Sequence, residues 1–142
     1  MIKWPNDLLA DGAKISGILL EGAGDAVIVG IGVNLAHHPI DIDRAATSLA
    51  ALGFPPPDPA DFAEDLAASF AAGLSRWRNE GLAALFARWQ ARAHPLGTAL
   101  RVNAPDGVFE GLYQGLDADG ALRLATPDGL LHLVHAGDVF LL

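Results

Sequence analysis

The stretch AVIVGIGV at residues 26–33 decides the fold of the first part of the chain. It is rich in β-branched residues and barely alternates between apolar and polar side chains, which is typical of a strand covered on both faces. A second apolar run, ISGILL at residues 15–20, precedes it across a glycine-rich turn, and Asp11-Gly12 predicts another tight turn before that run. We therefore expect a three-stranded meander within residues 2–35. Its apolar faces need a second layer, much of which we expect from chain upstream of Met1.

The middle of the chain predicts helices. Residues 44–54 fit a short helix, and the prolines at 55–57 mark a linker. Asp58 and Pro59 suit the cap and the first position of a longer helix. Apolar residues then recur at helical spacing, break near residues 79–81 and resume, so we expect two consecutive helices. We expect their apolar side chains in the core: Phe62, Leu66, Phe70, Leu74 and Trp77, then Leu82, Leu85, Phe86 and Trp89.

The pattern changes to short strands from Leu96 onward. Three Asp-Gly pairs recur at hairpin spacing between apolar runs, at residues 106–107, 119–120 and 128–129. Four or five strands in so short a segment predict a small barrel of the SH3-like kind. The expected fold class is therefore α+β. A partial mixed sheet with helices occupies residues 1–94, and an SH3-like β-barrel occupies residues 95–142.

Composition excludes several functional classes. The formal net charge of −8 argues against binding nucleic acid through its phosphates. The chain has no cysteine, so disulfides, thiolate catalysis and cysteine-held zinc are excluded. Apolar runs are too short for a membrane span and no signal peptide is evident, so we expect no membrane association and a cytosolic, or cytoplasmic, location. The only two lysines are Lys3 and Lys14, and arginine cannot always replace lysine beside a reacting phosphate or carboxylate.

The first motif is Lys3-Trp4-Pro5-Asn6-Asp7, at the end of an expected strand. Pro5 fixes the backbone, so the two polar side chains that follow are presented in set directions. An amide beside a carboxylate suits adenine recognition next to a magnesium-bound phosphate, because the amide both donates and accepts and the carboxylate can hold the hard cation. An Asx-type turn would explain the same two residues without any ligand.

The second motif, Lys14-Ile15-Ser16-Gly17-Ile18-Leu19, places a lysine where a strand begins. Lys14 could neutralise charge on a carboxylate that attacks an α-phosphate, and Gly17 lets a ligand approach the backbone closely. A solvent-exposed turn lysine is the alternative.

The third motif, Gly30-Ile31-Gly32-Val33-Asn34, resembles a dinucleotide fingerprint only superficially. The third glycine is missing, and His37-His38-Pro39 follows in place of a helix. The two glycines instead allow close approach of a ligand to the backbone, and Asn34 offers a second amide to a base. We interpret the two histidines as part of a surface loop.

These three motifs, in this order and spacing, resemble the second half of the biotin–protein ligase catalytic domain. The resemblance continues through the helical pair into an SH3-like C-terminal domain. Such ligases join biotin to ATP through magnesium, Mg2+, to form biotinyl-5′-adenylate and pyrophosphate. They then transfer biotin to a lysine of a biotin carboxyl carrier protein.

The resemblance also implies roles for individual residues. Lys14 would be the catalytic residue, in contact with the biotin carboxyl and α-phosphate region. Asn6 and Asn34 would bind adenine, and Asp7 would serve the phosphate and Mg2+. Gly17 would pass its backbone close to biotin, and Lys3 would lie on the nucleotide side. We assign Trp4 to packing.

The family's glycine- and arginine-rich loop, which closes over biotin and the adenylate, would lie upstream of the first motif, and Met1 begins almost at that motif. We therefore expect this chain alone to lack ligase activity and to self-associate through its exposed sheet. A non-catalytic partner-binding module with an SH3-like domain remains an alternative. So does a lipoate-type ligase, which shares the catalytic fold, although the Trp-Pro-Asn-Asp string favours biotin.

Overall fold

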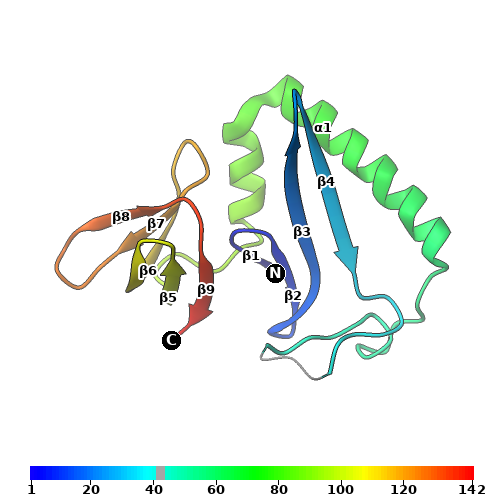
Figure 1. Ribbon diagram of the computed structural model, residues 1–142, viewed down its shortest axis with the longest axis horizontal. Coiled ribbons are helices and arrows are strands. Elements are labelled where there is room, and N and C mark those ends of the chain that lie inside the picture. The colour runs from blue at the N-terminus through cyan, green and yellow to red at the C-terminus, as the bar shows by residue number, and fades with distance from the viewer. Residues whose placement is uncertain (41–43) are drawn as a thin grey trace. The chain divides into compact units, whose positions relative to one another are not determined.

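In the first part of the chain, three successive strands pair antiparallel within a four-stranded sheet (Figure 1). They are β2 (Asp7–Ala10), β3 (Ala13–Ala23) and β4 (Ala26–Val33). Asp11 and Gly12, which join β2 to β3, have φ angles of 48° and 79°, the positive values that a two-residue Asp-Gly hairpin turn requires. The meander expected from the sequence is therefore confirmed. Parallel pairing occurs only as isolated bridges among the residues that the structure describes, one of them between Lys14 and Ala46.

The computed structural model describes residues 1–40 and 44–142. These residues form two compact units: the first comprises Met1 and residues 6–75, and the second comprises residues 2–5 and 76–142. The division between the units falls inside the long helix α1 (Pro59–Gln90). This division does not test the domain boundary predicted between residues 94 and 95, which stays a prediction.

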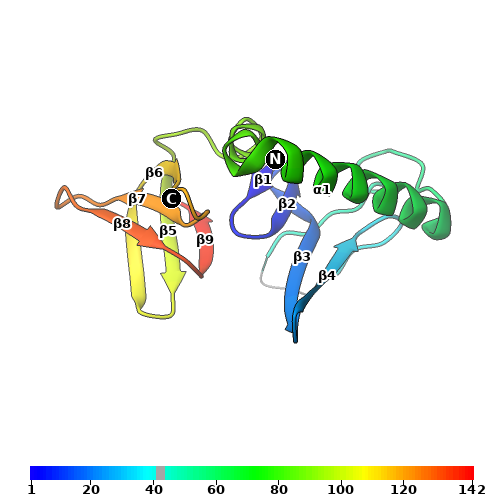
Figure 2. The ribbon, with the colours of Figure 1, turned by 90° about the horizontal axis from the view of Figure 1, so that it is seen from above.

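The sequence predicts that both faces of β4 are covered, with much of the covering layer supplied from upstream of Met1, and within the described residues both faces are largely exposed. Val27 and Ile28 point to opposite faces of the strand and are 63% and 55% exposed. One face of β4 lies along the first part of α1 (Figure 2). The packing there is loose, because Val29 and Ile31 line an apolar hollow of about 290 Å³ with the small side chains of Ala63 and Ala67 and with Leu66 and Phe70.

The helix α1 begins as predicted. The Oδ1 atom of Asp58 accepts hydrogen bonds from the N–H groups of Ala60 at 2.8 Å and Asp61 at 3.4 Å, which satisfies donors that the first turn leaves unpaired. Gly81 interrupts the helix with φ 78° and ψ 178°, so the predicted pair of helices is confirmed.

The apolar stripe of the helix is less buried than predicted. Phe70 and Trp77 are 46% and 44% exposed, and no residue of α1 is fully buried, so the expectation that this stripe lies in the core is wrong for these side chains. After the break at Gly81, Trp89 is partly buried and packs against the core of the second unit.

Residues 44–54 do not form the predicted short helix. Their main chain pairs with the start of β3: the N–H of Lys14 donates to the carbonyl of Ala45 at 2.8 Å, and the N–H of Thr47 donates to the carbonyl of Lys14 at 2.9 Å. A single turn follows, closed by the N–H of Leu52 on the carbonyl of Ser48. The turn ends at Gly53, whose φ is 85°. Pairing with β3 therefore takes backbone groups that a helix would need.

The second unit contains a five-stranded antiparallel sheet in the order β8-β7-β6-β5-β9. The last strand of this sheet, β9, pairs with its first strand, β5, and Val102 lies opposite Val139. Gly120 and Gly129 lie in turns and have φ of 86° and 84°, as the Asp-Gly pairs predict. With helices on either side of Gly81 and two sheets among the described residues, the α+β class and the small C-terminal β-domain are confirmed. The strands are β5 (Ala99–Ala104), β6 (Gly107–Leu116), β7 (Leu122–Ala125), β8 (Leu131–Val134) and β9 (Asp138–Leu141).

The hydrophobic core of the described residues lies in the second unit and includes Trp4, which follows the short strand β1 (Ile2–Lys3). Trp4 is 6% exposed and its Nε1–H donates to the carbonyl of Gly120 at 3.1 Å, so the packing role predicted for it is confirmed.

The Tyr113 hydroxyl donates to Oε1 of Gln90 at 2.6 Å, and burial raises the pKa of Tyr113 to about 12. None of the described helices has the length and apolar character needed to cross a membrane.

Candidate functional site

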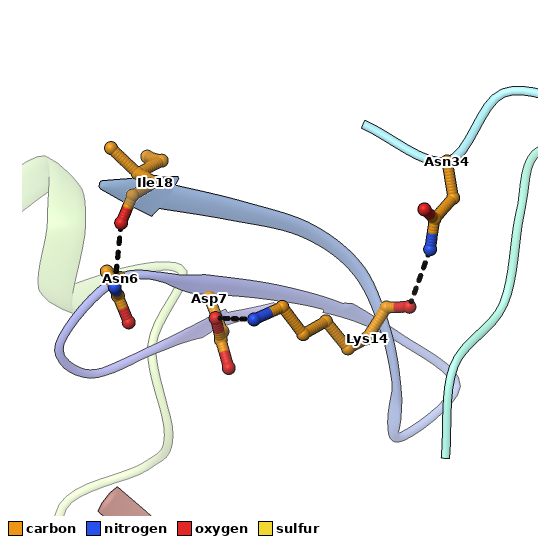
Figure 3. A network of polar contacts seen from close by, with 5 residues as sticks. All are labelled: Asn6, Asp7, Lys14, Ile18 and Asn34. Atoms are coloured by element: carbon orange, nitrogen blue, oxygen red, sulfur yellow. Dashed lines mark hydrogen bonds and ion pairs between the residues drawn. The ribbon is translucent and has the colours of Figure 1, made fainter. Parts of the chain in front are cut away.

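Two of the sequence motifs meet where β2 and β3 run side by side (Figure 3). Asp7 opens β2 and lies opposite Gly17 of β3. Lys14 lies three residues before Gly17 and extends its side chain back along the strands toward Asp7. Its Nζ atom lies 2.5 Å from Oδ1 of Asp7. A lysine and a carboxylate from separate motifs therefore form one ion pair.

The two partners of this ion pair differ in burial. The side chain of Asp7 is 8% exposed, whereas that of Lys14 is 40% exposed. A carboxylate removed from water is stable in its ionised form only when it has a partner, and Lys14 supplies one. The Lys14 side chain is therefore partly accessible to a ligand, while that of Asp7 is largely shielded.

Gly17 provides the space in which the lysine side chain lies. A Cβ atom at this position would lie 2.9 Å from Nζ of Lys14, 3.0 Å from its Cε and 3.5 Å from Oδ1 of Asp7. The first two separations are shorter than side chains normally tolerate. Gly17 therefore allows the ion pair to lie directly over the backbone of β3.

Two hollows in the first unit meet at Lys14. The larger has a volume of about 640 Å³, and the smaller has a volume of about 460 Å³. Lys14, Gly17 and Gly32 line both, and we call these three residues the shared rim. The larger hollow is also lined by Ile15, Ser16, Val33, Asn34, Pro39, Arg44 and Ala46, and the smaller by Asn6, Ile18, Leu19, Gly30 and Ile31.

The two predicted base-binding amides line different hollows, and both already donate to the backbone (Figure 3). Nδ2 of Asn6 donates to the carbonyl of Ile18 at 2.7 Å. Nδ2 of Asn34 donates to the carbonyl of Thr47 at 2.9 Å and lies 3.5 Å from that of Lys14. These bonds leave the amide oxygens to face other partners. Adenine binding by the two residues stays a prediction.

Sequence reasoning missed the contribution of the segment around Arg44 and Ala46, which lines the larger hollow. Ser48 is 1% exposed, and its Oγ accepts a hydrogen bond from the N–H of Ala51 and lies 3.2 Å from Nδ1 of His38. His37 and His38 lie in a loop outside helices and strands, as expected, and His38 also contacts Ser48. A serine that bonds the backbone three residues on is a local signal that could have been recognised. No comparable signal marks Ser16 or Arg44 as lining residues.

Lys3 and the other predicted site residues belong to different units. Lys3 belongs to the second unit, where its Nζ lies 5.7 Å from the centroid of the Phe140 ring, a cation–π distance. The structure thus brings together Asn6, Asp7, Lys14, Gly17 and Asn34 within the first unit. The nucleotide-side role of Lys3 stays a prediction without support from this geometry.

Asp7 does not fit a protein-held magnesium site. Mg2+ requires near-octahedral oxygen coordination and keeps several waters, but Oδ1 of Asp7 is paired with an ammonium group and the side chain is buried. Within residues 1–40 and 44–142, no group of three or more His, Asp or Glu side chains could hold a metal ion.

Comparison with known proteins agrees with these motifs. Residues 96–142 match the family described as "Biotin protein ligase C terminal domain". The chain is 39% identical over 139 residues to the biotin–[acetyl-CoA-carboxylase] ligase of Mycobacterium tuberculosis, a match that covers 97% of this chain and 52% of that protein. It is 38% identical to the enzyme of the same name from Paracoccus denitrificans, covering 98% of this chain and 62% of that protein. The chain therefore spans about half the length of the curated relatives it matches.

The fold also matches a solved protein. The apo structure of the biotin protein ligase from Aquifex aeolicus has a TM-score of 0.88 at 23% identity, covering 99% of this chain and 65% of that one. The same Aquifex protein in complex with biotin and ATP has a TM-score of 0.83 at 24% identity, covering 99% of this chain and 61% of that one. At these identities the likeness shows the fold.

Proposed function

We propose that the chain is part of a biotin–protein ligase and carries part of the site at which such an enzyme activates biotin with ATP. The proposed products are biotinyl-5′-AMP and pyrophosphate, and the acceptor of the biotinyl group is a lysine of a biotin carboxyl carrier protein. Biotin is favoured over lipoate because the curated relatives are named biotin ligases and the Aquifex protein was solved with biotin and ATP.

The position of Lys14 is the observation that carries this proposal. It lies at the shared rim, so one lysine borders both adjoining hollows. A ligase must bring together two substrates at one reacting bond, and it needs positive charge where negative charge develops. Two adjoining hollows with a single lysine at their boundary meet both requirements. A partner-binding module would need neither, so the geometry favours the enzyme over that alternative.

The proposed chemistry assigns Lys14 to the first of two steps. An oxygen of the biotin carboxylate attacks the α-phosphorus of ATP, and the bond to the β-phosphate oxygen breaks to release pyrophosphate. The ammonium of Lys14 stabilises the negative charge on the reacting phosphate. In the second step the carrier lysine amine attacks the biotinyl carbonyl carbon, AMP leaves, and the amine proton passes to solvent.

The nucleotide is proposed to enter as its magnesium complex, with Mg2+ held by the phosphates and water, since Asp7 does not fit the ion. Asn6 and Asn34 are proposed to contact the adenine through groups that their backbone hydrogen bonds leave available. Gly17 is proposed to let biotin lie close to the strand, because it has no side chain and lines both hollows at the shared rim.

A chimera tests this function directly. The segment of the Mycobacterium tuberculosis ligase that matches this chain is replaced by residues 1–142, and biotin-dependent pyrophosphate release from ATP is measured. We expect activity, and we expect Lys14→Ala to lower it by roughly two or more orders of magnitude, because charge stabilisation at the reacting centre is lost. Asp25→Ala, in the turn between β3 and β4, is the control and should retain the chimera's rate.

The outcome that contradicts the proposal is equally direct. A folded chimera that releases pyrophosphate at an unchanged rate after Lys14→Ala would remove the lysine from the reaction. A chimera that folds, as circular dichroism would report, but makes no adenylate would contradict the ligase function of this chain. Carrier biotinylation, followed by mass spectrometry, extends the test to the second step.

A further inference from the structure

We propose that Asp7 is the residue that positions the Lys14 ammonium at the shared rim, an inference that rests on the proposed function. In this arrangement Lys14 is the catalytic residue, Asp7 holds it, and Gly17 provides the space for it. Asp7 therefore takes no part in binding magnesium. The inference assigns the carboxylate of the first motif to the lysine of the second.

The pairing of the strands sets up this contact. Asp7 pairs with Gly17, and Leu9 pairs with Lys14, with a shift of register between Leu8 and Leu9. The backbone of Lys14 therefore lies nearer the hairpin turn than the backbone of Asp7. Its side chain must run back along β3 to reach Oδ1 of Asp7 at 2.5 Å (Figure 3). A long, flexible side chain that lies in this direction needs an anchor at its end, because several rotamers compete with this one.

The difference in burial shows which partner is the anchor. Asp7 is held in a fixed strand position and its side chain is 8% exposed, whereas the Lys14 side chain is 40% exposed. Loss of the carboxylate would free the ammonium to move toward solvent, at little cost to a lysine. Loss of the ammonium would instead leave a buried charge without its partner, which is strongly unfavourable. The carboxylate therefore fixes the position of the lysine.

Gly17 supplies independent support for this arrangement. The lysine side chain crosses the place that a Cβ atom of residue 17 would occupy, at 2.9 Å from Nζ and 3.0 Å from Cε. Any larger residue would push the ammonium away from Asp7, since the lysine end is the flexible partner. Gly22 on the same strand has nothing within 4 Å of a Cβ position. The chain thus contains a matched pair of glycines, of which only one touches the lysine.

The sequence makes a spectroscopic test simple, because Lys3 and Lys14 are its only lysines. The full chain is labelled with ¹³C-lysine, and the Cε–Hε signals are assigned with Lys3→Arg. In the wild-type protein we expect the two Hε protons of Lys14 to give separate signals, as for an immobilised side chain. Asp7→Asn and Gly17→Ala should each collapse this separation, and Gly22→Ala should preserve it. The amide spectrum of each variant reports whether the sheet is intact.

Two results would overturn the inference. One is a Lys14 signal that keeps its separation in a folded Asp7→Asn protein, because the carboxylate would then not hold the lysine. The other comes from titration with MgCl2 and with ATP plus MgCl2: a saturable Mg2+-dependent change of the Lys14 signal that Asp7→Asn abolishes would make Asp7 a metal ligand. None of these readouts needs catalysis. An inactive chimera would contradict the proposed function and leave the positioning result standing.

Discussion

At the scale of single residues, Asn34 donates a hydrogen bond to the backbone and has a proposed role in adenine binding. One substitution tests both. Its Nδ2 holds the carbonyl of Thr47, which belongs to the segment that lines the larger hollow. We predict that Asn34→Ala weakens ATP binding by about 1–3 kcal/mol, because a base edge and a backbone carbonyl each lose a partner. Isothermal titration of the chain with ATP measures this change.

The control for Asn34 is Asn103→Ala, which makes the same substitution at an exposed position of β5. Biotin binding measured without nucleotide should change little in Asn34→Ala. The opposite pattern, with unchanged ATP binding and weakened biotin binding, would mean that Asn34 lies beside biotin and that the adenine assignment is wrong.

His94 makes a second prediction at this scale, on pH dependence. Burial, together with the positive charge of Lys3, lowers the pKa of His94 below its usual 6.5. The folded state therefore favours the neutral ring, whereas the unfolded chain binds a proton below about pH 6.5. Because the unfolded state binds more protons in that range, the free energy of unfolding falls as pH drops below about 6.5 and is fully recovered above it.

Urea denaturation at about pH 5 and about pH 7.5 checks this sign for His94. His94→Gln should reduce the difference in the free energy of unfolding between the two pH values. His37→Gln, at an exposed histidine, is the control and should leave the difference unchanged. A difference that survives His94→Gln in full would assign the pH dependence to other groups.

The residues of the site could be predicted from the sequence in part. Lys14, Asp7, Gly17 and the two amides stand in motifs, and the structure brings them together. Their contacts could not be predicted, because the register shift between Leu8 and Leu9 decides which side chains meet. A one-residue change of register moves a side chain to the other face of a sheet. The sequence alone did not reveal that Asp7 and Lys14 meet, and it suggested a metal ion as the partner of Asp7. In the structure the partner of Asp7 is Lys14.

At the scale of elements, two glycines of α1 should respond to alanine with opposite signs. Gly81 has φ 78° and ψ 178°, a combination that essentially only glycine adopts, so Gly81→Ala should destabilise the protein by about 1–3 kcal/mol. Gly73 lies in regular helix with nothing within 4 Å of a Cβ position. Gly73→Ala should stabilise the protein by about 0.5–1 kcal/mol, because alanine has the higher helix propensity.

Chemical denaturation of both glycine variants tests the break in α1, and each variant is the control for the other. Similar gains in stability at both positions would mean that the helix continues through Gly81 when the glycine is removed. Far-ultraviolet circular dichroism would then report an increase in helix content for Gly81→Ala.

Elements with local signals were predictable, and those fixed by distant contacts were not. The cap at Asp58, the break at Gly81 and the turn at Asp11-Gly12 each follow from the conformation that a few neighbouring residues prefer. Residues 44–54 also have a helical pattern, yet their backbone pairs with Lys14, some thirty positions earlier in the chain. Pairing across such a separation has no local sequence signal, and tertiary contacts override weak helix propensity.

At the scale of the whole molecule, the two units differ in how their apolar side chains are covered. Every fully buried apolar side chain among the described residues belongs to the second unit. In the first unit the fully buried side chains are polar, and β4 lies at the edge of its sheet. Burial of apolar area is the main favourable term in folding, so the first unit should open more readily.

Hydrogen exchange followed by mass spectrometry tests this difference, because each amide reports the free energy of its own opening. We predict slow exchange for β5, β6 and β7 and fast exchange for β4 and the outer half of β3.

Exposed apolar residues on an edge strand also favour association. At rising protein concentration, protection should therefore appear first around Leu19, Leu20, Val27 and Ile28, which are at least 55% exposed. Leu20→Lys should weaken that protection, and Leu130→Lys, at an exposed leucine of the second unit, should not. Uniform protection at every concentration would show that the first unit is as stable as the second and that its sheet does not associate.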